Sequence, residues 1–341
     1  MFSWKKIRHH FETALCRLLA WWVPHLTRQS CIHLANGIGR VAFMLDRRGR
    51  ELAMANVRCA LGPSITDARR SEIVEASYRN FARTMVDLFW SPALVRPQNR
   101  HWLRSKGWEY LRTRLDREER GAVLLTLHFG NWEWASLASS WNMMPCLAVA
   151  ETFKNPGLDD LFKSLREVNG QTIIPQEKSM LRMLRQVKRH GTVAFLADLT
   201  VAPSQASAVI RAFSLEMCVS VLHSVLALRG NAYICPAVCI PQRDGGSLLQ
   251  AYPPLDIPEN ATPASIAQLC WDFYEPIIRA NPHLWLWPYK HFRYRPQDAK
   301  VEYPFYANEW EAFDQLRSES ASSRGFRADA SKQAQMEERG A

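Results

Sequence analysis

The spacing of apolar residues divides the chain into two parts. Up to about residue 120, apolar positions recur at intervals of three and four residues with many arginines between them, which is typical of amphipathic helices. This spacing predicts one helix over 40–59 and another over 67–89. The segment Gly62-Pro63-Ser64 separates them, because glycine and proline favour turns. The first third of the chain is therefore expected to be helical.

Beyond residue 120 the pattern changes to short β-rich runs that alternate with helical stretches. The runs cover 122–127, 193–197 and 232–240. The clearest helices cover 159–168 and 179–189, and 264–279 also has apolar residues at helical spacing. Strands that alternate with helices predict an α/β fold. We expect a mixed or mostly parallel central sheet flanked by helices, with a helical, membrane-associating region at the N-terminus.

These patterns suggest four regions. Residues 1–30 form an amphipathic helix, 31–120 a helical region packed on the core, and 121–310 the α/β core. Residues 311–341 form a tail. From about residue 318 the tail contains mainly Ser, Ala, Arg, Gln and Glu, so it is expected to be largely disordered.

The positive charge of the chain is concentrated in its first third. Residues 1–120 carry 22 Lys+Arg against 11 Asp+Glu, a difference of +11, whereas residues 121–341 carry 21 against 22, a difference of −1. Such a region suits an anionic partner, either nucleic acid or an anionic membrane surface. No nucleic-acid-binding fingerprint accompanies the charge, so nucleic acid is not expected as a partner.

The composition of the N-terminal segment favours a membrane surface. Residues 11–26 place apolar side chains at helical spacing and contain paired tryptophans, and Lys5, Lys6, Arg8 and Arg17 supply cations. The segment is too short and too interrupted to span a bilayer, and it lacks the pattern of a cleaved signal peptide. An amphipathic helix that simply packs on the domain is the alternative.

The cysteines do not suggest a metal site. All eight are scattered, with no CxxC motif and no zinc-ligand spacing. Free thiols in a reducing compartment are expected. The sequence suggests neither a metal ion nor a cofactor.

The strongest chemical signal lies at the end of the first β-rich run. The run delivers His128, and Phe129-Gly130-Asn131 then form a tight turn in which Asn131 caps a helix. Glu133 falls in the first turn of that helix, where it could accept the second imidazole N–H and orient the ring as a general base. The alternative is a buried histidine that is merely satisfied by a nearby carboxylate.

The segment His128-Phe129-Gly130-Asn131-Trp132-Glu133 resembles the signature of the bacterial lipid A late acyltransferases, the lauroyl/myristoyl transferase family. The likeness extends from about residue 30 to about 296. Further matching segments are Arg50–Leu61 with Gly62, Asn155-Pro156-Gly157-Leu158-Asp159 with Arg166, Ser179 to Asp198, and Leu284–Phe292.

The resemblance implies a reaction at the cytoplasmic face of the bacterial inner membrane, by a peripheral or monotopic protein. An acyl chain would pass from an acyl-carrier protein, or another thioester donor, to a hydroxyl of a lipid A precursor or related glycolipid. His128 would be the general base and Glu133 would orient it. No covalent acyl-enzyme is implied, and the chain has no Gly-x-Ser-x-Gly elbow.

Further residues are candidates for substrate binding or for stabilising the oxyanion. They are Arg166, Asp198, Asn131, Gly130 and Asn155. Arg166 could instead lie on a solvated helix face, and Asp198 could be a turn or cap residue. Asn155-Pro156 is expected to form a turn that presents Arg166. The tryptophans at 285–287 are more often core than acyl-chain lining.

The chain also departs from the family pattern after Asp198. Residues 199–203 and 212–215 replace a Gly-containing loop and a Phe-Gly motif, which leaves the substrate open. A lysophospholipid, a mannosylated inositide or an aminolipid is therefore an alternative acceptor. A non-catalytic lipid-binding relative is an alternative of another class.

Overall fold

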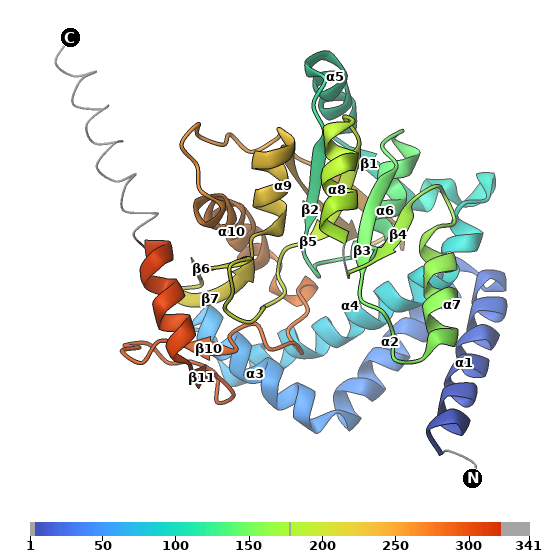
Figure 1. Ribbon diagram of the computed structural model, residues 1–341. Helices are drawn as coiled ribbons and strands as arrows, with labels where there is room; N and C mark the ends of the chain where they lie inside the picture. The colour runs from blue at the N-terminus through green and yellow to red at the C-terminus, as the bar shows by residue number, and fades with distance from the viewer. Residues whose placement is uncertain (1–3, 177–178, 322–341) are drawn as a thin grey trace.

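The computed structural model describes residues 4–176 and 179–321, and a twisted sheet with helices on both faces lies at its centre (Figure 1). The helices are α1 (Trp4–Trp22), α2 (Arg28–Leu45), α3 (Arg47–Leu61), α4 (Asp67–Leu94), α5 (Trp108–Glu118), α6 (Trp132–Trp141), α7 (Pro156–Arg166), α8 (Ser179–Lys188), α9 (Leu222–Gly230) and α10 (Pro263–Ala280). Short 3-10 helices cover Val23–His25, Pro97–Trp102 and Pro282–Leu284.

The sheet has seven strands in the order β1-β9-β8-β2-β5-β3-β4. Its strands are β1 (Leu103–Lys106), β2 (Ala122–Thr126), β3 (Cys146–Ala150), β4 (Thr172–Pro175), β5 (Thr192–Leu196), β8 (Tyr233–Pro241) and β9 (Ser247–Ala251). All neighbours run parallel except β8 and β9. The smaller pairs are β6 (Ser207–Ala212) with β7 (Leu215–Ser220), and β10 (Tyr294–Arg295) with β11 (Asn308–Glu309). The predicted α/β class is confirmed.

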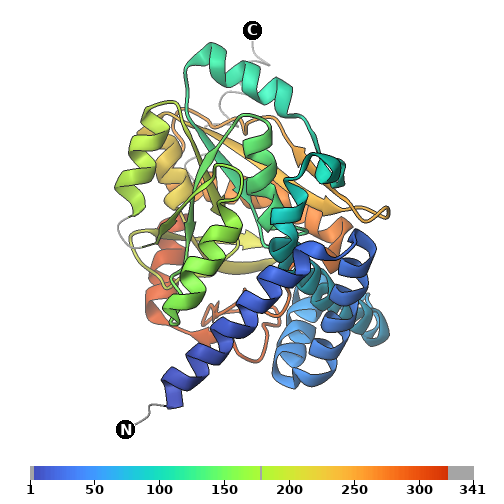
Figure 2. The same ribbon diagram turned by 90° about the vertical axis from the view of Figure 1, so that its right-hand side faces the viewer.

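Alternation along β2 explains why helices cover both faces. Val123 and Leu125 enter the core formed with α8, α9 and α10, whereas Leu124 enters the core formed with α4, α5 and α6. Figures 1 and 2 show α1 to α4 gathered at the end of the molecule to which β2 points. These helices therefore close the carboxyl edge of the sheet from below.

The structure differs from the predicted elements at two places in the N-terminal third. The helix expected over 40–59 is broken at Asp46. The Asp46 N–H donates to the Ala42 carbonyl at the end of α2, and the Asp46 side chain accepts a hydrogen bond from the Gly49 N–H at the start of α3. Strand β1 lies within the region expected to be helical throughout, and it pairs with β9. Strands at a sheet edge are short, so periodicity alone did not reveal β1.

The predicted tail begins with ordered structure. Residues 311–321 are helical, and the buried ring of Phe313 packs with Val209 and Cys218 of the β6–β7 hairpin. The helix thus continues a few residues beyond 318, where disorder was expected to begin. The rest of that prediction, over 322–341, lies outside the described residues.

Candidate active site

His128 lies at the carboxyl edge of the sheet, just beyond β2. Its N–H donates to Asp198 Oδ2 at 2.9 Å, and its carbonyl accepts from the Leu286 N–H at 3.0 Å. Because β2 and β5 are in register at Thr126 and Leu196, the residues two positions farther on come side by side. Ligand sites of open α/β sheets lie at this edge. The structure thus brings together two residues that were each expected at a strand end.

The imidazole of His128 pairs with a buried carboxylate. Nδ1 lies 2.9 Å from Asp198 Oδ1; the Asp198 side chain is fully buried, and the His128 side chain keeps 15% of its surface exposed. Asp198 Oδ2 also accepts the Trp285 indole N–H at 2.8 Å. Burial acts to raise the pKa of Asp198, but the neighbouring His128, His291 and Trp285 outweigh it and hold that pKa below its ordinary value.

This geometry fixes which nitrogen of His128 can act as a base. An ionised carboxylate only accepts hydrogen bonds, so in the neutral ring Nδ1 carries the hydrogen that Asp198 receives. Nε2 is then left with its lone pair. The arrangement can take a proton at Nε2, and Asp198 stabilises the imidazolium that results.

Two aromatic residues behind Asp198 were not identified as site residues from the sequence. Trp285 is fully buried, as expected for core, yet its indole N–H also holds Asp198. The His291 ring stacks on Trp285 with the ring centres 3.9 Å apart, and its Nε2 lies 2.8 Å from the Leu286 carbonyl. Burial lowers the pKa of His291 to about 4, so this ring is neutral at pH 7. The matching segment 284–292 was the only sequence signal for either residue.

Glu133 has a different partner from the one expected. Both of its carboxylate oxygens are bonded by Arg166, from Nε at 2.9 Å and Nη2 at 2.7 Å. Burial acts to lower the pKa of Arg166, but the charge of Glu133 outweighs it and the net shift is upward. The expected contact of Glu133 with the imidazole is replaced by Asp198, because β5 lies beside β2 whereas Glu133 faces α7. Arg166 is accordingly part of an ion pair and not a free surface cation.

Gly130 and Asn131 form the buried turn that follows His128. Gly130 has φ +62°, and a Cβ there would lie 2.1 Å from the Cys239 carbonyl oxygen, so only glycine fits. The Asn131 side chain accepts from the Trp134 N–H at 3.1 Å, which confirms the predicted cap, and donates to Asp87 at 2.8 Å. Since Asn131 is fully buried, both the oxygen and the nitrogen of its amide are used in hydrogen bonds within the protein.

Asn155 joins α7 to the N-terminal helix. Its Oδ1 accepts from the Gly157 N–H at 3.2 Å, which caps α7, and its Nδ2 donates to the His9 carbonyl at 2.9 Å. Arg166 is the last residue of the same helix. Asn155 thus begins the helix that ends at Arg166, and it also fastens that helix to α1.

The segment that departs from the family pattern is a tight hairpin turn. Phe213 and Ser214 connect β6 to β7 with φ values of 55° and 63°, a left-handed conformation that favours glycine. The buried Phe213 ring stacks on Trp285 with the ring centres 5.5 Å apart. This segment therefore supports the residue that holds Asp198.

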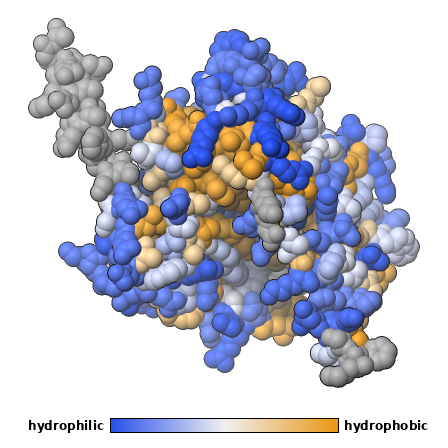
Figure 3. Space-filling view, in the orientation of Figure 1, coloured by the Kyte–Doolittle hydropathy of each residue, from blue (hydrophilic) through white to orange (hydrophobic). Residues whose placement is uncertain are grey.

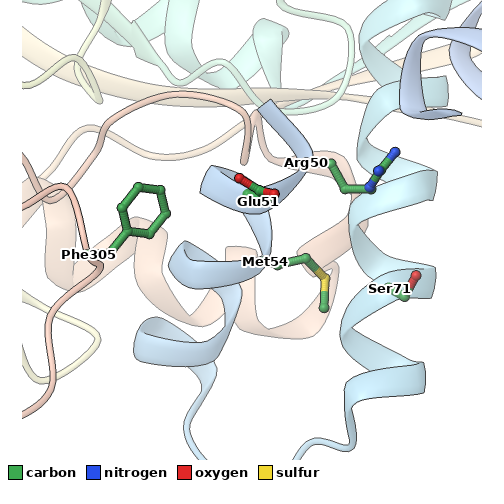
Figure 4. A pocket seen from close by; sticks show the side chains of 5 residues that line it. All are labelled: Arg50, Glu51, Met54, Ser71 and Phe305. Atoms are coloured by element: carbon green, nitrogen blue, oxygen red, sulfur yellow. The ribbon is translucent and has the colours of Figure 1, made fainter. Parts of the chain in front are cut away.

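Two cavities open on the described surface. One, of about 190 Å³, lies at the ends of β3 and β4 and includes Arg166, Glu151 and Lys163 in its wall. Figure 3 shows a hollow near the centre of one face of the molecule, with apolar side chains gathered above it. The other cavity, of about 540 Å³, lies between α3, α4 and Phe305, and its lining shares no residue with the His128 site (Figure 4).

An apolar stripe faces outward on α1. The residues of this stripe, all exposed, are Trp4, Ile7, Phe11, Leu15, Leu18 and Trp22. A shorter stripe on α2 contains Ile38, Val41 and Leu45. The inner side of α1 packs through Cys16, Leu19 and Ala20 against the core near α4 and α6. Among residues 4–176 and 179–321, no helix combines the length and apolar character needed to cross a membrane.

Comparisons with known proteins identify the family of this chain. The phosphatidylinositol mannoside acyltransferase of Mycolicibacterium smegmatis (strain ATCC 700084 / mc(2)155) is 25% identical over 241 residues, which cover 70% of this chain and 77% of that protein. Residues 5–294 match the family described as bacterial lipid A biosynthesis acyltransferase. That match covers most of the chain and includes every site residue described above. The chain therefore belongs to the bacterial lipid A biosynthesis acyltransferase family, and it is an acyltransferase of this glycolipid-modifying group.

Proposed function

We propose that this acyltransferase moves a fatty acyl chain from an acyl-carrier-protein thioester to a hydroxyl of a lipid A precursor or related glycolipid, with His128 as the general base. The observation that carries this proposal is the hydrogen bond between His128 Nδ1 and the buried Asp198 carboxylate at the strand ends. It leaves Nε2 as a base on a partly exposed ring, in a family that transfers acyl groups.

In this mechanism Nε2 takes the proton of the acceptor hydroxyl as its oxygen attacks the thioester carbonyl. The new C–O bond forms, the C–S bond breaks, and the proton passes from the imidazolium to the leaving thiolate. Asp198 stays ionised throughout and stabilises the imidazolium. Positioned base catalysis of this kind contributes about 10²–10⁴-fold to a rate.

The Glu133–Arg166 pair supplies a fixed cation to the same region. Glu133 follows His128 by five residues and uses Nε and Nη2 of Arg166, so the guanidinium is held in one orientation. Nη1 lies outside this pair and is our candidate donor to the thioester oxyanion or to an acceptor phosphate. In this role Glu133 positions Arg166, and Asp198 positions His128.

A mannosylated phosphatidylinositol is the second candidate acceptor. The mycobacterial relative is named for acylating a phosphatidylinositol mannoside, and the match covers 77% of its length. Both acceptors present a sugar hydroxyl beside a phosphate on a lipid anchor. The same base and cation would serve either one.

We also propose that the protein works at the cytoplasmic face of the inner membrane, bound through α1. The exposed apolar stripe of α1 is flanked by Lys5, Lys6, Arg8 and Arg17, which suits insertion among anionic headgroups. Replacing Phe11 and Leu15 with Ser would leave the packed inner side of α1 intact. We expect the wild type, but not Phe11→Ser/Leu15→Ser, to sediment with anionic vesicles; equal sedimentation of both would place the membrane contact elsewhere.

The chemistry is tested by assaying purified protein with an acyl-carrier-protein thioester and either lipid acceptor. We expect His128→Ala to abolish turnover and Asp198→Asn to lower kcat by about 10³–10⁴-fold, because an asparagine no longer enforces the working tautomer. Thr113→Ala, a substitution at an exposed position of α5, serves as the control. Full activity of His128→Ala would reject the general-base mechanism. Lipid binding without turnover on any acceptor would favour a non-catalytic protein.

A further inference from the structure

Helix α8 presents an outward face that contains only positive charge. Residues 179–197 include Arg182, Arg185, Lys188 and Arg189 and no acidic residue. Met183 and Val187 are fully buried against the sheet, which turns these four cations toward solvent, and all of them are exposed. Within residues 4–176 and 179–321, none of the four has a carboxylate within ion-pair distance.

A neighbouring helix extends the cationic face. Arg229, at the end of α9, is exposed and has no ion-pair partner in the described part of the chain. The next residue, Gly230, lies so close to α8 that a Cβ there would meet Val187 Cγ2 at 2.4 Å. Arg229 therefore adjoins the C-terminal half of α8. We call Arg182, Arg185, Lys188, Arg189 and Arg229 the α8 face.

The local structure does not account for this concentration of charge. Arg185 and Lys188 lie in the last turn of α8, where the helix dipole favours cations. Arg182 lies near the start, where it does not, and it stands three residues from Arg185, which itself stands four from Arg189. Like charges at these spacings destabilise a helix. A partner that brings negative charge would relieve the repulsion.

The start of α8 lies at the same edge of the sheet as the active site. Helix α8 begins close to the carboxyl edge of the sheet, after β4, and its ten residues extend about 15 Å back along the sheet before β5 returns toward Asp198. Figure 1 shows α8 above the ends of β3 and β5, and Figure 3 shows hydrophilic side chains over this helix beside the central hollow. A partner seated there can direct a flexible arm over the edge to His128.

We propose that the α8 face is the docking surface for the acidic carrier protein that presents the acyl thioester. This inference rests on the proposed function, because it assigns the donor of that reaction. Complementary charge steers association and makes it dependent on salt. The surface therefore determines the affinity for the carrier-borne donor and leaves the chemical step at His128 unchanged.

The test uses the full-length protein and the variant Arg182→Gln/Arg185→Gln/Arg189→Gln. The matched control is Lys106→Gln/Arg243→Gln/Lys300→Gln, which removes three exposed cations elsewhere that have no ion pair among the described residues. We expect the α8 variant to raise KM for the acyl-carrier-protein donor at least tenfold, with kcat unchanged. We expect normal rates with an acyl-pantetheine donor, and a weaker dependence of KM on salt.

Direct binding of the carrier protein, followed by calorimetry, separates this inference from the proposed function. Tight binding to the wild type and the control, and at least tenfold weaker binding to the α8 variant, would support docking even if no acceptor were acylated. Equal binding to all three proteins would overturn the inference. Turnover with acyl-coenzyme A but no binding of the carrier protein would also overturn it, while leaving the acyl transfer intact.

Discussion

Asp198 is held by donors from two segments that lie far apart in the chain. His128 supplies its ring and its main-chain N–H from the end of β2, Trp285 supplies an indole N–H, and His291 lies behind Trp285 as a neutral ring. A buried carboxylate needs such donors because burial alone would raise its pKa and neutralise it. The basicity of His128 Nε2 therefore depends on residues that never touch the substrate.

Replacing Trp285 with Phe tests this dependence. The change keeps an aromatic ring and removes one hydrogen bond that lowers the pKa of Asp198, so that pKa should rise. A bond to a charged group is worth about 1.5–3 kcal/mol, and we expect kcat/KM to fall at least tenfold and the acid limb of the pH–rate profile to move to higher pH. Trp287→Phe is the control, because the buried Trp287 indole donates to the Pro282 carbonyl. Identical profiles for the two variants would argue against the role of Trp285.

Two buried histidines should make the fold sensitive to mild acid. Burial lowers the pKa of both His223 and His291 to about 4 from an ordinary value of 6.5. Between those values the unfolded chain binds protons that the folded protein does not, so stability is lost as pH falls from 6.5 toward 4. Linkage gives a loss of about 2 kcal/mol per histidine between pH 7 and pH 5.

Urea unfolding at pH 7 and pH 5 measures this loss. His223→Asn should reduce the difference in unfolding free energy between the two pH values, whereas His33→Gln, at an exposed position, should leave it unchanged. A wild-type protein equally stable at both pH values would contradict the burial of these rings.

At the scale of elements, the Asn155 side chain is hydrogen-bonded both to the N-terminal helix α1 and to α7, the helix that bears Arg166. Asn155 caps α7 through its oxygen and binds the His9 carbonyl of α1 through its nitrogen. Gly157 lies so close to Thr13 of α1 that a Cβ there would meet the Thr13 hydroxyl oxygen at 2.7 Å. Movement of α1 is therefore transmitted to the start of α7.

Substituting Asn155 with Asp separates the two functions of this side chain. Aspartate can still cap α7, but it cannot donate to His9 and it adds negative charge beside Glu12. We expect hydrogen exchange to increase in α1 while α7 stays protected. Asn155→Ala should also cost about 1 kcal/mol of stability through loss of the cap. Unchanged exchange in α1 for Asn155→Asp would show that apolar packing alone holds that helix.

The left-handed backbone of the turn between β6 and β7 lowers the stability of the protein, and one substitution should remove this effect. Ser214 has φ 63°, where a side chain is disfavoured by about 1 kcal/mol and glycine is not. Ser214→Gly should therefore raise the free energy of unfolding by up to about that amount. Ser220→Gly, at the end of β7, is the comparison and should lower it. A destabilised Ser214→Gly protein would mean that the serine side chain makes a compensating contact.

The sequence was sufficient to predict the elements around His128 but not the pairing of its side chain. Strand β2, the Asn131 cap and the strand-end positions of His128 and Asp198 all follow from local patterns. Whether Glu133 or Asp198 reaches the ring depends on strand order, which places β5 beside β2 although β3 comes first in the chain. The sequence could not show this order, because parallel pairing joins segments that are far apart.

At the scale of the whole molecule, a buried ion pair between α2 and α4 is hydrogen-bonded on both sides to the α/β core. The Arg28 guanidinium binds both carboxylate oxygens of Asp87, with Nη2 to Oδ2 at 3.0 Å, and its Nε donates to the Gly245 carbonyl at 2.7 Å. Asn131 of the catalytic turn also donates to Asp87. The N-terminal helices are thus part of the support of the site.

Arg28→Met should destabilise the whole protein. It removes the forked partner of the buried Asp87 carboxylate and leaves only the more distant Arg83, 3.8 Å away, so we expect a loss of about 3 kcal/mol. Arg47→Met breaks the exposed pair with Glu51 and should cost less than about 0.5 kcal/mol. Chemical unfolding measures both changes. A similar small loss for the two variants would indicate that water reaches Asp87.

The distance along the chain between the donors of Asp198 has a consequence during translation. Trp285 follows Asp198 by 87 residues, so at about 5–20 residues per second a ribosome needs about 4–17 s to add it. Strands β8 and β9, which complete the sheet, are also made in that interval. A growing chain thus holds His128 and Asp198 before the segments that support them exist. The working site assembles only when nearly the whole chain has left the ribosome.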